Sequence, residues 1–239
     1  MVCIEQVVIE CVKTNYMIFS SKPICNSINI VFDKQRVNTA KLLGVIIEDR
    51  LSWLCHVLHV CKKLNKSLAV INKVKNILND DTMKYLYNAL ILPYLLYCCE
   101  VWGNASKYLI DRVVVLQKRA IRIISKSEYK AHTLPLFIKY NLLKFVDIVK
   151  FKILLLMYKA KEGSLPDNLQ MFFKIKTSDT ISTRQDGKFY VAYARTKIKA
   201  NCISICGVKL WNNLNVDISN IKPFKKFKLN LKKHIINSY

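Results

Sequence analysis

Two pairs of adjacent carboxylates are the first residues in this sequence that could hold a divalent metal ion. The pairs are Glu48-Asp49 and Asp80-Asp81. Enzymes of phosphoryl transfer bring carboxylates together because Mg²⁺ prefers oxygen ligands. Glu48-Asp49, however, follows a strand-like run as a turn would, and Asp80-Asp81 precedes a helical pattern, where carboxylates favour the N-terminal dipole. We interpret both pairs as turn and helix-capping residues, so the sequence predicts no metal site.

Cysteine and histidine residues between Cys55 and Cys61 form a second candidate metal site. On a helix, Cys55 and His59 would share one face, but Cys61 would point toward the apolar side. No second ligand pair follows at the spacing of a zinc finger, and Cys202 and Cys206 lack partners at that spacing as well. We expect these side chains to be core or surface residues.

Basic residues carry the strongest functional signal. The chain has 39 Lys+Arg against 16 Asp+Glu, a formal net charge of +23. An excess of this size attracts polyanions, such as nucleic acid or an anionic membrane surface. Only seven of the basic residues are Arg, and Lys binds phosphate as a point charge, which favours contact with a backbone over recognition of bases. The predicted nucleic-acid-binding residues are Lys62, Lys63, Lys66, Lys73, Arg112, Arg119, Arg122 and Lys126.

Hydrophobic periodicity places these basic residues on helices. From residue 51 onward, apolar residues recur at three- and four-residue steps, which is typical of amphipathic helices. The 52% hydrophobic content is enough for a sizeable core. The predicted helices cover residues 51–78, 80–99 with a kink at Pro93, 106–126, 143–161 and a final segment from Pro223.

The first 50 residues show a different pattern. Three runs rich in β-branched and aromatic residues, at 15–20, 27–32 and 41–47, predict a small antiparallel sheet of three strands. The expected fold is therefore mainly α, with a small antiparallel β-hairpin region at the N-terminus (α+β).

Cysteine usage and hydropathy predict the compartment. The nine cysteines are irregularly spaced and no secretory signal is present, so we expect an intracellular protein of the nucleus or cytoplasm with free thiols. The longest uncharged stretch, residues 85–99, is shorter than the ~20 residues that a membrane span needs. We expect no membrane partner.

Several short strings, taken in their order and spacing, are typical of one family. They are Lys13–Phe19 (KTNYMIF), Lys41–Ile47 (KLLGVII) with Leu51-Ser52-Trp53 and His56, Leu92–Leu95 (LPYL) with Tyr97–Gly103 (YCCEVWG), Leu116–Arg122 (LQKRAIR), and Lys209–Asn212 (KLWN). In this arrangement the chain resembles the carboxy-terminal part of reverse transcriptases of non-LTR (LINE-type, jockey-like) retrotransposons, from about residue 13 onward.

The resemblance implies a role for each region. Residues 1–50 look like a palm remnant, in which Leu42, Leu43, Gly44 and Val45 form a primer-grip-like hairpin. Residues 51–162 look like a helical, thumb-like domain whose basic face would contact a template–primer duplex. Residues 163–239 would form a basic C-terminal region with short strands and a terminal helix. The partners implied are RNA, DNA or an RNA–DNA duplex.

The catalytic part of the family is missing from this sequence. No Tyr-x-Asp-Asp string occurs, so the Mg²⁺ of the full-length family enzyme has no ligands here, and we expect the chain to need no cofactor and to be inactive alone. The chain would then be the non-catalytic portion of an RNA-directed DNA polymerase, working with an upstream palm domain. Two alternatives are a stand-alone, non-catalytic nucleic-acid-binding protein and a decayed element copy without function.

Overall fold

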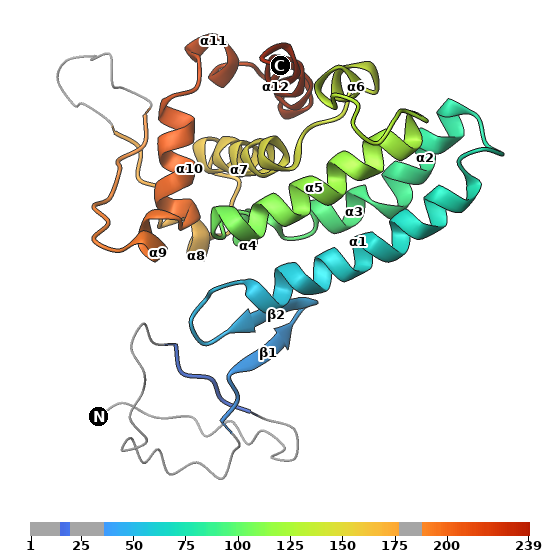
Figure 1. Cartoon of the computed structure of the whole chain (residues 1–239). Helices are drawn as coiled ribbons and strands as arrows, with labels where there is room; N and C mark the ends of the chain where they lie inside the picture. Colours follow the sequence, from blue (N-terminus) through green and yellow to red (C-terminus); the bar gives the residue numbers. More distant parts are fainter. Residues whose placement is uncertain (1–14, 20–35, 177–187) are drawn as a thin grey trace, which may run out of the picture. The chain divides into compact units, whose positions relative to one another are not determined.

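A computed structural model of the chain describes residues 15–19, 36–176 and 188–239. This part of the chain holds twelve helices and one two-stranded sheet (Figure 1). The mainly α fold with a small antiparallel hairpin near the N-terminus is therefore confirmed. The chain divides into two compact units, Met1–His56 and Val57–Tyr239, which we describe one at a time.

The sheet of the first unit is a tight hairpin. Strand β1 (Thr39–Leu42) pairs with β2 (Val45–Glu48), with Leu42 opposite Val45. Between them, Leu43 and Gly44 both have positive φ angles, 46° and 84°. This is the backbone of a type I′ turn, which matches the twist of the strands and needs two positive φ angles. Gly44 suits its place in the turn, because glycine adopts a positive φ without steric cost.

The expectation of one strand over residues 41–47 was wrong, because the chain reverses in the middle of that run. The apolar residues on both sides of the turn look like one continuous strand in the sequence. Of the other predicted strands, 27–32 lies outside the described residues. Tyr16, in the run 15–20, forms an isolated bridge with Arg36, and Val37 N–H donates to the Tyr16 carbonyl at 3.0 Å.

The second unit consists of helices. The long predicted helices are confirmed, with ends shifted by a few residues: α1 (Leu54–Val74), α5 (Lys107–Ile124), α7 (Phe145–Lys161) and α12 (Phe224–Asn237). Shorter helices that the periodicity did not predict lie between them: α6 (Leu134–Lys139), α8 (Asp167–Gln170), α9 (Lys197–Ala200), α10 (Ile203–Asn212) and α11 (Val216–Ser219).

The predicted kinked helix of residues 80–99 is three separate helices, α2 (Asp80–Leu90), α3 (Leu92–Leu96) and α4 (Cys99–Trp102). The break falls just before Pro93, because proline lacks the N–H that a continuous helix would use. The capping residue of α2 is Asn79, whose side chain accepts from Thr82 N–H at 2.9 Å, while Asp80 and Asp81 occupy the first turn.

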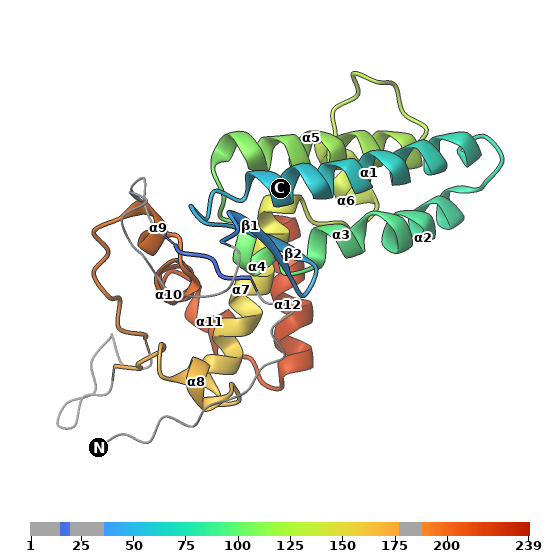
Figure 2. The same ribbon diagram turned by 90° about the horizontal axis from the view of Figure 1, so that it is seen from below.

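Helix α7 is the centre of the second unit. It contacts α3, α4 and α5, which precede it in the chain, and α10 and α12, which follow it (Figures 1 and 2). Nine of its residues are buried, as the apolar character of most of its circumference predicts. Near its C-terminal end, Tyr158 stacks on Phe227 with 4.5 Å between ring centroids and meets Trp211 edge-on at 6.4 Å. These aromatic rings tie α10 and α12 to α7.

A buried glutamine joins three helices beneath the outer surface of α5. The Gln117 amide donates to the Tyr87 hydroxyl at 3.0 Å and to the Leu143 carbonyl at 2.9 Å, and its oxygen accepts from Phe145 N–H at 2.7 Å. Phe145 is the first residue of α7, whose capping position, Lys144, offers no side-chain hydrogen bond. Gln117 therefore satisfies a helix N-terminus while fixing the rotation of α5 about its axis.

Candidate nucleic-acid interface

Helix α1 presents a row of uncompensated lysines. It carries four Lys and no Asp or Glu, and Lys62, Lys63, Lys66 and Lys73 are all exposed. The opposite face is buried through Val57, Val60, Cys61, Leu64, Leu68 and Ile71. None of the four lysines forms a hydrogen bond or ion pair with another residue in the described ranges. This outward face has the charge and exposure that phosphate contact requires.

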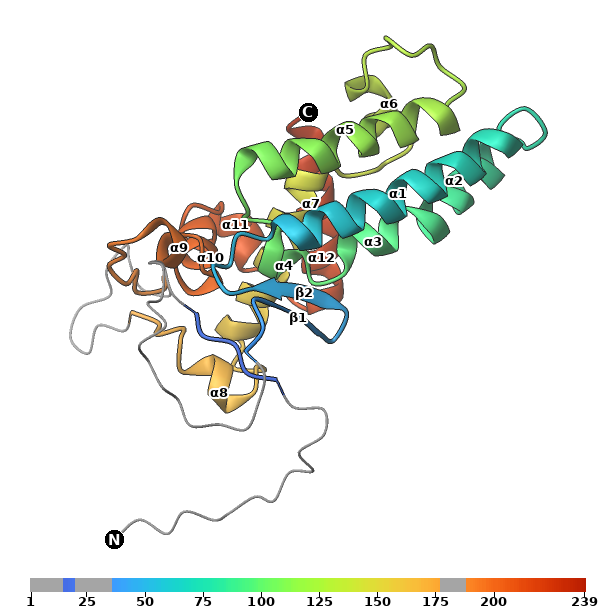
Figure 3. The ribbon, with the colours of Figure 1, turned by 60° about the horizontal axis from the view of Figure 1, so that its bottom comes forward.

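Helix α5 lies beside α1 and runs in the same direction (Figures 1 and 3). Arg112 is exposed and donates to the Tyr108 hydroxyl at 2.6 Å. Burial raises the pKa of the Cys61 thiol, and the positive charge of Arg112 lowers it in part, which places this guanidinium close to α1. Arg119 is exposed as well.

The C-terminal ends of α1 and α5, with the residues that follow them, line a basic groove of about 290 Å³. Its lining residues are Asn72, Lys75, Asn76, Arg119, Arg122, Ile123, Lys126, Ser127 and Tyr129. Four of these nine are cationic and none is acidic. The groove brings together three of the predicted binding residues, Arg119, Arg122 and Lys126. Lys62, Lys63, Lys66, Lys73 and Arg112 do not line it.

Two of the groove cations also hold its walls in place. Arg122 Nε donates to the Ala131 carbonyl at 2.9 Å, and Lys126 Nζ donates to the Leu78 carbonyl at 2.9 Å. Each cation uses one of its donors for this bond. The other N–H groups of the guanidinium and the ammonium can still donate to a ligand, and both side chains keep their positive charge.

The end of α5 is a Schellman motif without glycine. Ser127 N–H bonds to the Arg122 carbonyl at 3.0 Å, Lys126 N–H bonds to the Ile123 carbonyl at 3.2 Å, and Lys126 has a φ of 52°. Glycine is the usual residue at this left-handed position, because a side chain there costs energy. A lysine at this position therefore contributes charge to the groove at the expense of backbone stability.

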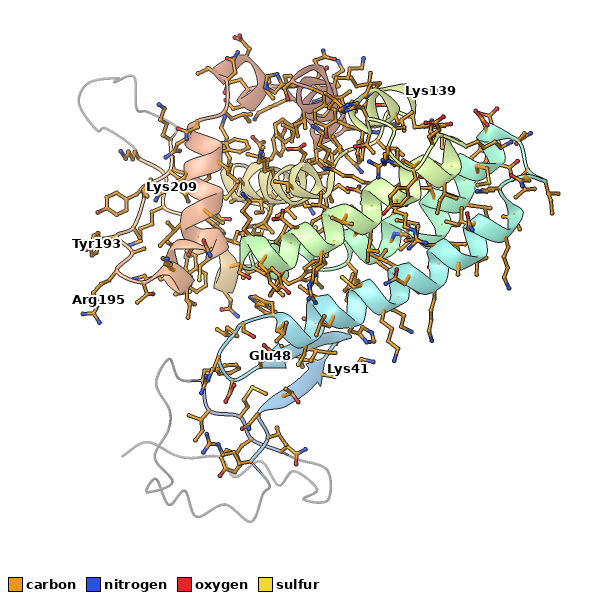
Figure 4. All side chains as sticks on the ribbon, in the orientation of Figure 1. Lys41, Glu48, Lys139, Tyr193, Arg195 and Lys209 are labelled. Atoms are coloured by element: carbon orange, nitrogen blue, oxygen red, sulfur yellow. The ribbon has the colours of Figure 1, made fainter. Side chains whose placement is uncertain are left out.

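Four acidic residues of this unit form ion pairs with lysines outside the groove. Lys139 pairs with Asp80 at 3.6 Å, Lys152 with Glu100 at 3.1 Å, Lys222 with Glu162 at 3.0 Å and Lys150 with Asp147 at 3.3 Å. Lys139 is labelled on α6 in Figure 4. None of these ion pairs involves a residue that lines the groove, and none of the lining residues is acidic.

The acidic pair Glu48-Asp49 has a structural role. The Glu48 carboxylate accepts hydrogen bonds from Cys55 N–H at 2.6 Å and from the Ser52 hydroxyl, so it caps the start of α1. Burial raises the pKa of Glu48, but the hydrogen bonds from Cys55, Ser52 and Leu54 together outweigh it and hold that pKa below its usual range. The prediction of a turn residue was incomplete, because Glu48 ends strand β2 and caps a helix.

The cysteine and histidine cluster does not form a metal site. His56 is buried, and its Nδ1 accepts from Ile46 N–H at 3.2 Å, while Cys55 is exposed and Cys61 is buried. Across residues 15–19, 36–176 and 188–239, no three His, Cys, Asp or Glu side chains gather where they could hold a metal ion. The described carboxylates therefore do not fit the Mg²⁺ that the resemblance implies for the full-length enzyme.

A second cavity, of about 360 Å³, lies between α7, α9 and α10 and the start of α5. Its lining is mainly apolar, with Ile110, Val149 and Ile153 among the residues, and it includes Lys209, which is labelled on α10 in Figure 4. Asn104 donates to Cys206 Sγ at 3.1 Å inside it. Sequence reasoning missed this cavity, and its apolar lining does not suit a polyanion.

Sequence reasoning also missed several residues of the basic groove. Asn72, Lys75 and Asn76 were not singled out because each is an ordinary polar residue in the helical pattern. Tyr129 lies in the loop after α5 and is 82% exposed. An aromatic residue in a polar loop was the one available signal for it.

The chain, a basic helical protein, is similar in sequence to polymerases of transposons. Over 95 residues, or 38% of this chain and 10% of the relative, it is 27% identical to the "Probable RNA-directed DNA polymerase from transposon X-element" of Drosophila melanogaster. It is 28% identical over 93 residues to the "Probable RNA-directed DNA polymerase from transposon BS" of the same species; these residues are 38% of this chain and 10% of that protein.

A third relative covers more of the chain. The "RNA-directed DNA polymerase from mobile element jockey" of Drosophila funebris is 23% identical over 147 residues, 60% of this chain and 16% of that protein. The resemblance to reverse transcriptases of non-LTR retrotransposons is thereby confirmed as a sequence similarity. The matched segments span between a tenth and a sixth of the length of these curated relatives.

No protein-family profile matches the chain, and no solved structure matches it significantly. In the part of the chain that the structure describes, no helix is both long and apolar enough to cross a membrane.

Proposed function

We propose that this chain binds nucleic acid through the basic surface of α1 and α5, as a non-catalytic portion of an RNA-directed DNA polymerase. The observation that carries the proposal is the row of four exposed lysines on α1, a helix without acidic residues, beside the basic groove. Phosphate contacts by lysine position a duplex without recognising its sequence. Similarity to polymerases of transposons makes an RNA–DNA duplex, RNA or DNA the expected partner.

The regions would divide the work as the resemblance implies. Residues 51–162 would act as the thumb-like part that follows the duplex, and 163–239 would add a basic C-terminal region. The hairpin around Leu42, Leu43, Gly44 and Val45 would act like a primer grip. Leu42 and Leu43 are 60% and 82% exposed at its tip, which suits apolar contact with a sugar or base.

A stand-alone nucleic-acid-binding protein is the second candidate. It would use the same basic surface of α1 and α5 without a catalytic domain. Complementation separates the two candidates: adding a catalytic palm domain from a related polymerase should restore template-dependent synthesis only under the first.

Salt-dependent binding tests the interface itself. Replacing Lys62, Lys63, Lys66 and Lys73 with Gln should weaken binding to a labelled RNA–DNA duplex. It should also reduce the slope of log affinity against log salt by about 0.9 for each phosphate contact that is removed, the value for B-DNA. The measurement is fluorescence anisotropy across a salt series.

A variant of α12 provides the matched control. Lys225, Lys226, Lys228 and Lys233 are also exposed, and their helix carries no acidic residue. Replacing these four with Gln removes the same charge from a different helix. If this variant lowers affinity and slope as much as the α1 variant, binding depends on net charge alone and the proposed interface is wrong.

A further inference from the structure

We propose that the basic groove between α1 and α5 holds one unpaired nucleotide of the bound strand, with its base stacked on Tyr129. The proposal rests on the proposed function, because it concerns the same surface, and it adds a preference for single-stranded over fully paired nucleic acid. The groove volume of about 290 Å³ is at the low end for small-ligand sites, so it suits one nucleotide and excludes a duplex.

Tyr129 provides the stacking surface. It is 82% exposed although it lines the groove, so one face of the ring is open to a ligand. The turn that carries it is held at both sides, because Ala131 N–H bonds to the Glu128 carbonyl at 3.1 Å and the Ala131 carbonyl accepts from Arg122. An exposed aromatic ring on a hydrogen-bonded turn beside cations is an arrangement that single-strand-binding proteins use for bases.

The other lining groups fit the rest of a nucleotide. Lys75, Arg119 and Arg122 supply positive charge for the phosphate, with no carboxylate among the lining residues. Asn72 lies in the last turn of α1 and Asn76 in the turn that follows the helix, and each side-chain amide offers both donors and an acceptor to the edge of a base. A base inside a duplex shows neither its face nor its pairing edge, whereas an unpaired base shows both.

Two probes and three variants test the proposal. The probes are a short blunt RNA–DNA duplex and the same duplex with a single-stranded 3′ extension. The wild-type chain should bind the extended probe about tenfold more tightly, within the range that base–aromatic stacking supports. Tyr129→Ala should abolish this preference, and Tyr129→Phe should retain it.

Tyr193→Ala is the matched control. Tyr193 is 83% exposed on the segment before α9 (Figure 4), so its loss should leave the preference intact. Equal binding of both probes by the wild type, or a preference that survives in Tyr129→Ala, overturns the inference while the proposed function stands. Failure of the wild type to bind either probe refutes the proposed function, and the inference with it.

Discussion

Replacing Gln117 with methionine should destabilise the helical unit strongly while leaving its size and packing nearly unchanged. The change removes three buried hydrogen bonds at once and leaves the Tyr87 hydroxyl, the Leu143 carbonyl and the Phe145 amide without their partner. A buried polar group that loses its partner costs about 1 to 3 kcal/mol. At somewhat more than about 1 kcal/mol for each of the three groups, the free energy of unfolding should fall by about 4 kcal/mol.

Urea denaturation followed by circular dichroism measures this loss. With a slope of about 2 kcal/mol per molar urea, the midpoint should fall by about 2 M. The matched control is Tyr87→Phe, which removes one of the three bonds and should cost only about 1 kcal/mol. A midpoint for Gln117→Met equal to that of Tyr87→Phe would show that Gln117 does not act as the joint between α5 and α7.

Four further outcomes follow from the structure. The purified chain should give no product in primer extension with Mg²⁺ or Mn²⁺; template-dependent incorporation by homogeneous protein would contradict this. Lys126→Gly and Lys126→Ala should weaken nucleic-acid binding equally. In urea denaturation the glycine variant should be about 1 kcal/mol more stable than the alanine variant, because glycine adopts the left-handed backbone without strain. Equal stability of the two variants would mean that the position is unstrained. Amides of β1 and β2 should exchange with deuterium well before those of α7, because an isolated hairpin is marginally stable; slower exchange in the hairpin would refute this. Glu48 has a lowered pKa in the folded chain, so its contribution to stability is complete above the usual glutamate pKa and disappears as the pH falls through the lowered value. Glu48→Gln should lack this part of the loss of stability in acid. Urea midpoints measured across acidic pH test this.

The sequence predicted the elements with long periodic patterns and failed where structure depends on distant contacts. Helices α1, α5 and α7 each have apolar residues at three- and four-residue steps over several turns, a pattern that indicates an amphipathic helix. Helices α8, α9 and α11 have four residues each, a single turn, so no period can appear in them. The reversal at Leu43 and Gly44 was hidden because leucine rarely adopts a positive φ.

The candidate interface was also predictable only in part. The lysines of α1 were predictable because their spacing alone places them on the outer face of a helix. The groove was only partly predictable, because Asn72, Asn76 and Tyr129 meet there through the packing of α1 beside α5 and the path of the loop after it. Glu48 caps a helix through a chain reversal in which Leu51 and Trp53 have positive φ angles, and no local pattern indicates that geometry.

The central position of α7 has a consequence for how the protein is made. One set of its partners, α3, α4 and α5, is synthesised before it, and the other set, α10 and α12, only after it. Even Tyr239 takes part, because its hydroxyl accepts from Lys144 N–H at 2.9 Å at the start of α7. During translation the side of α7 that receives Trp211 and Phe227 stays uncovered until α12 has left the ribosome, so the growing chain exposes an apolar, aggregation-prone surface that the folded unit conceals.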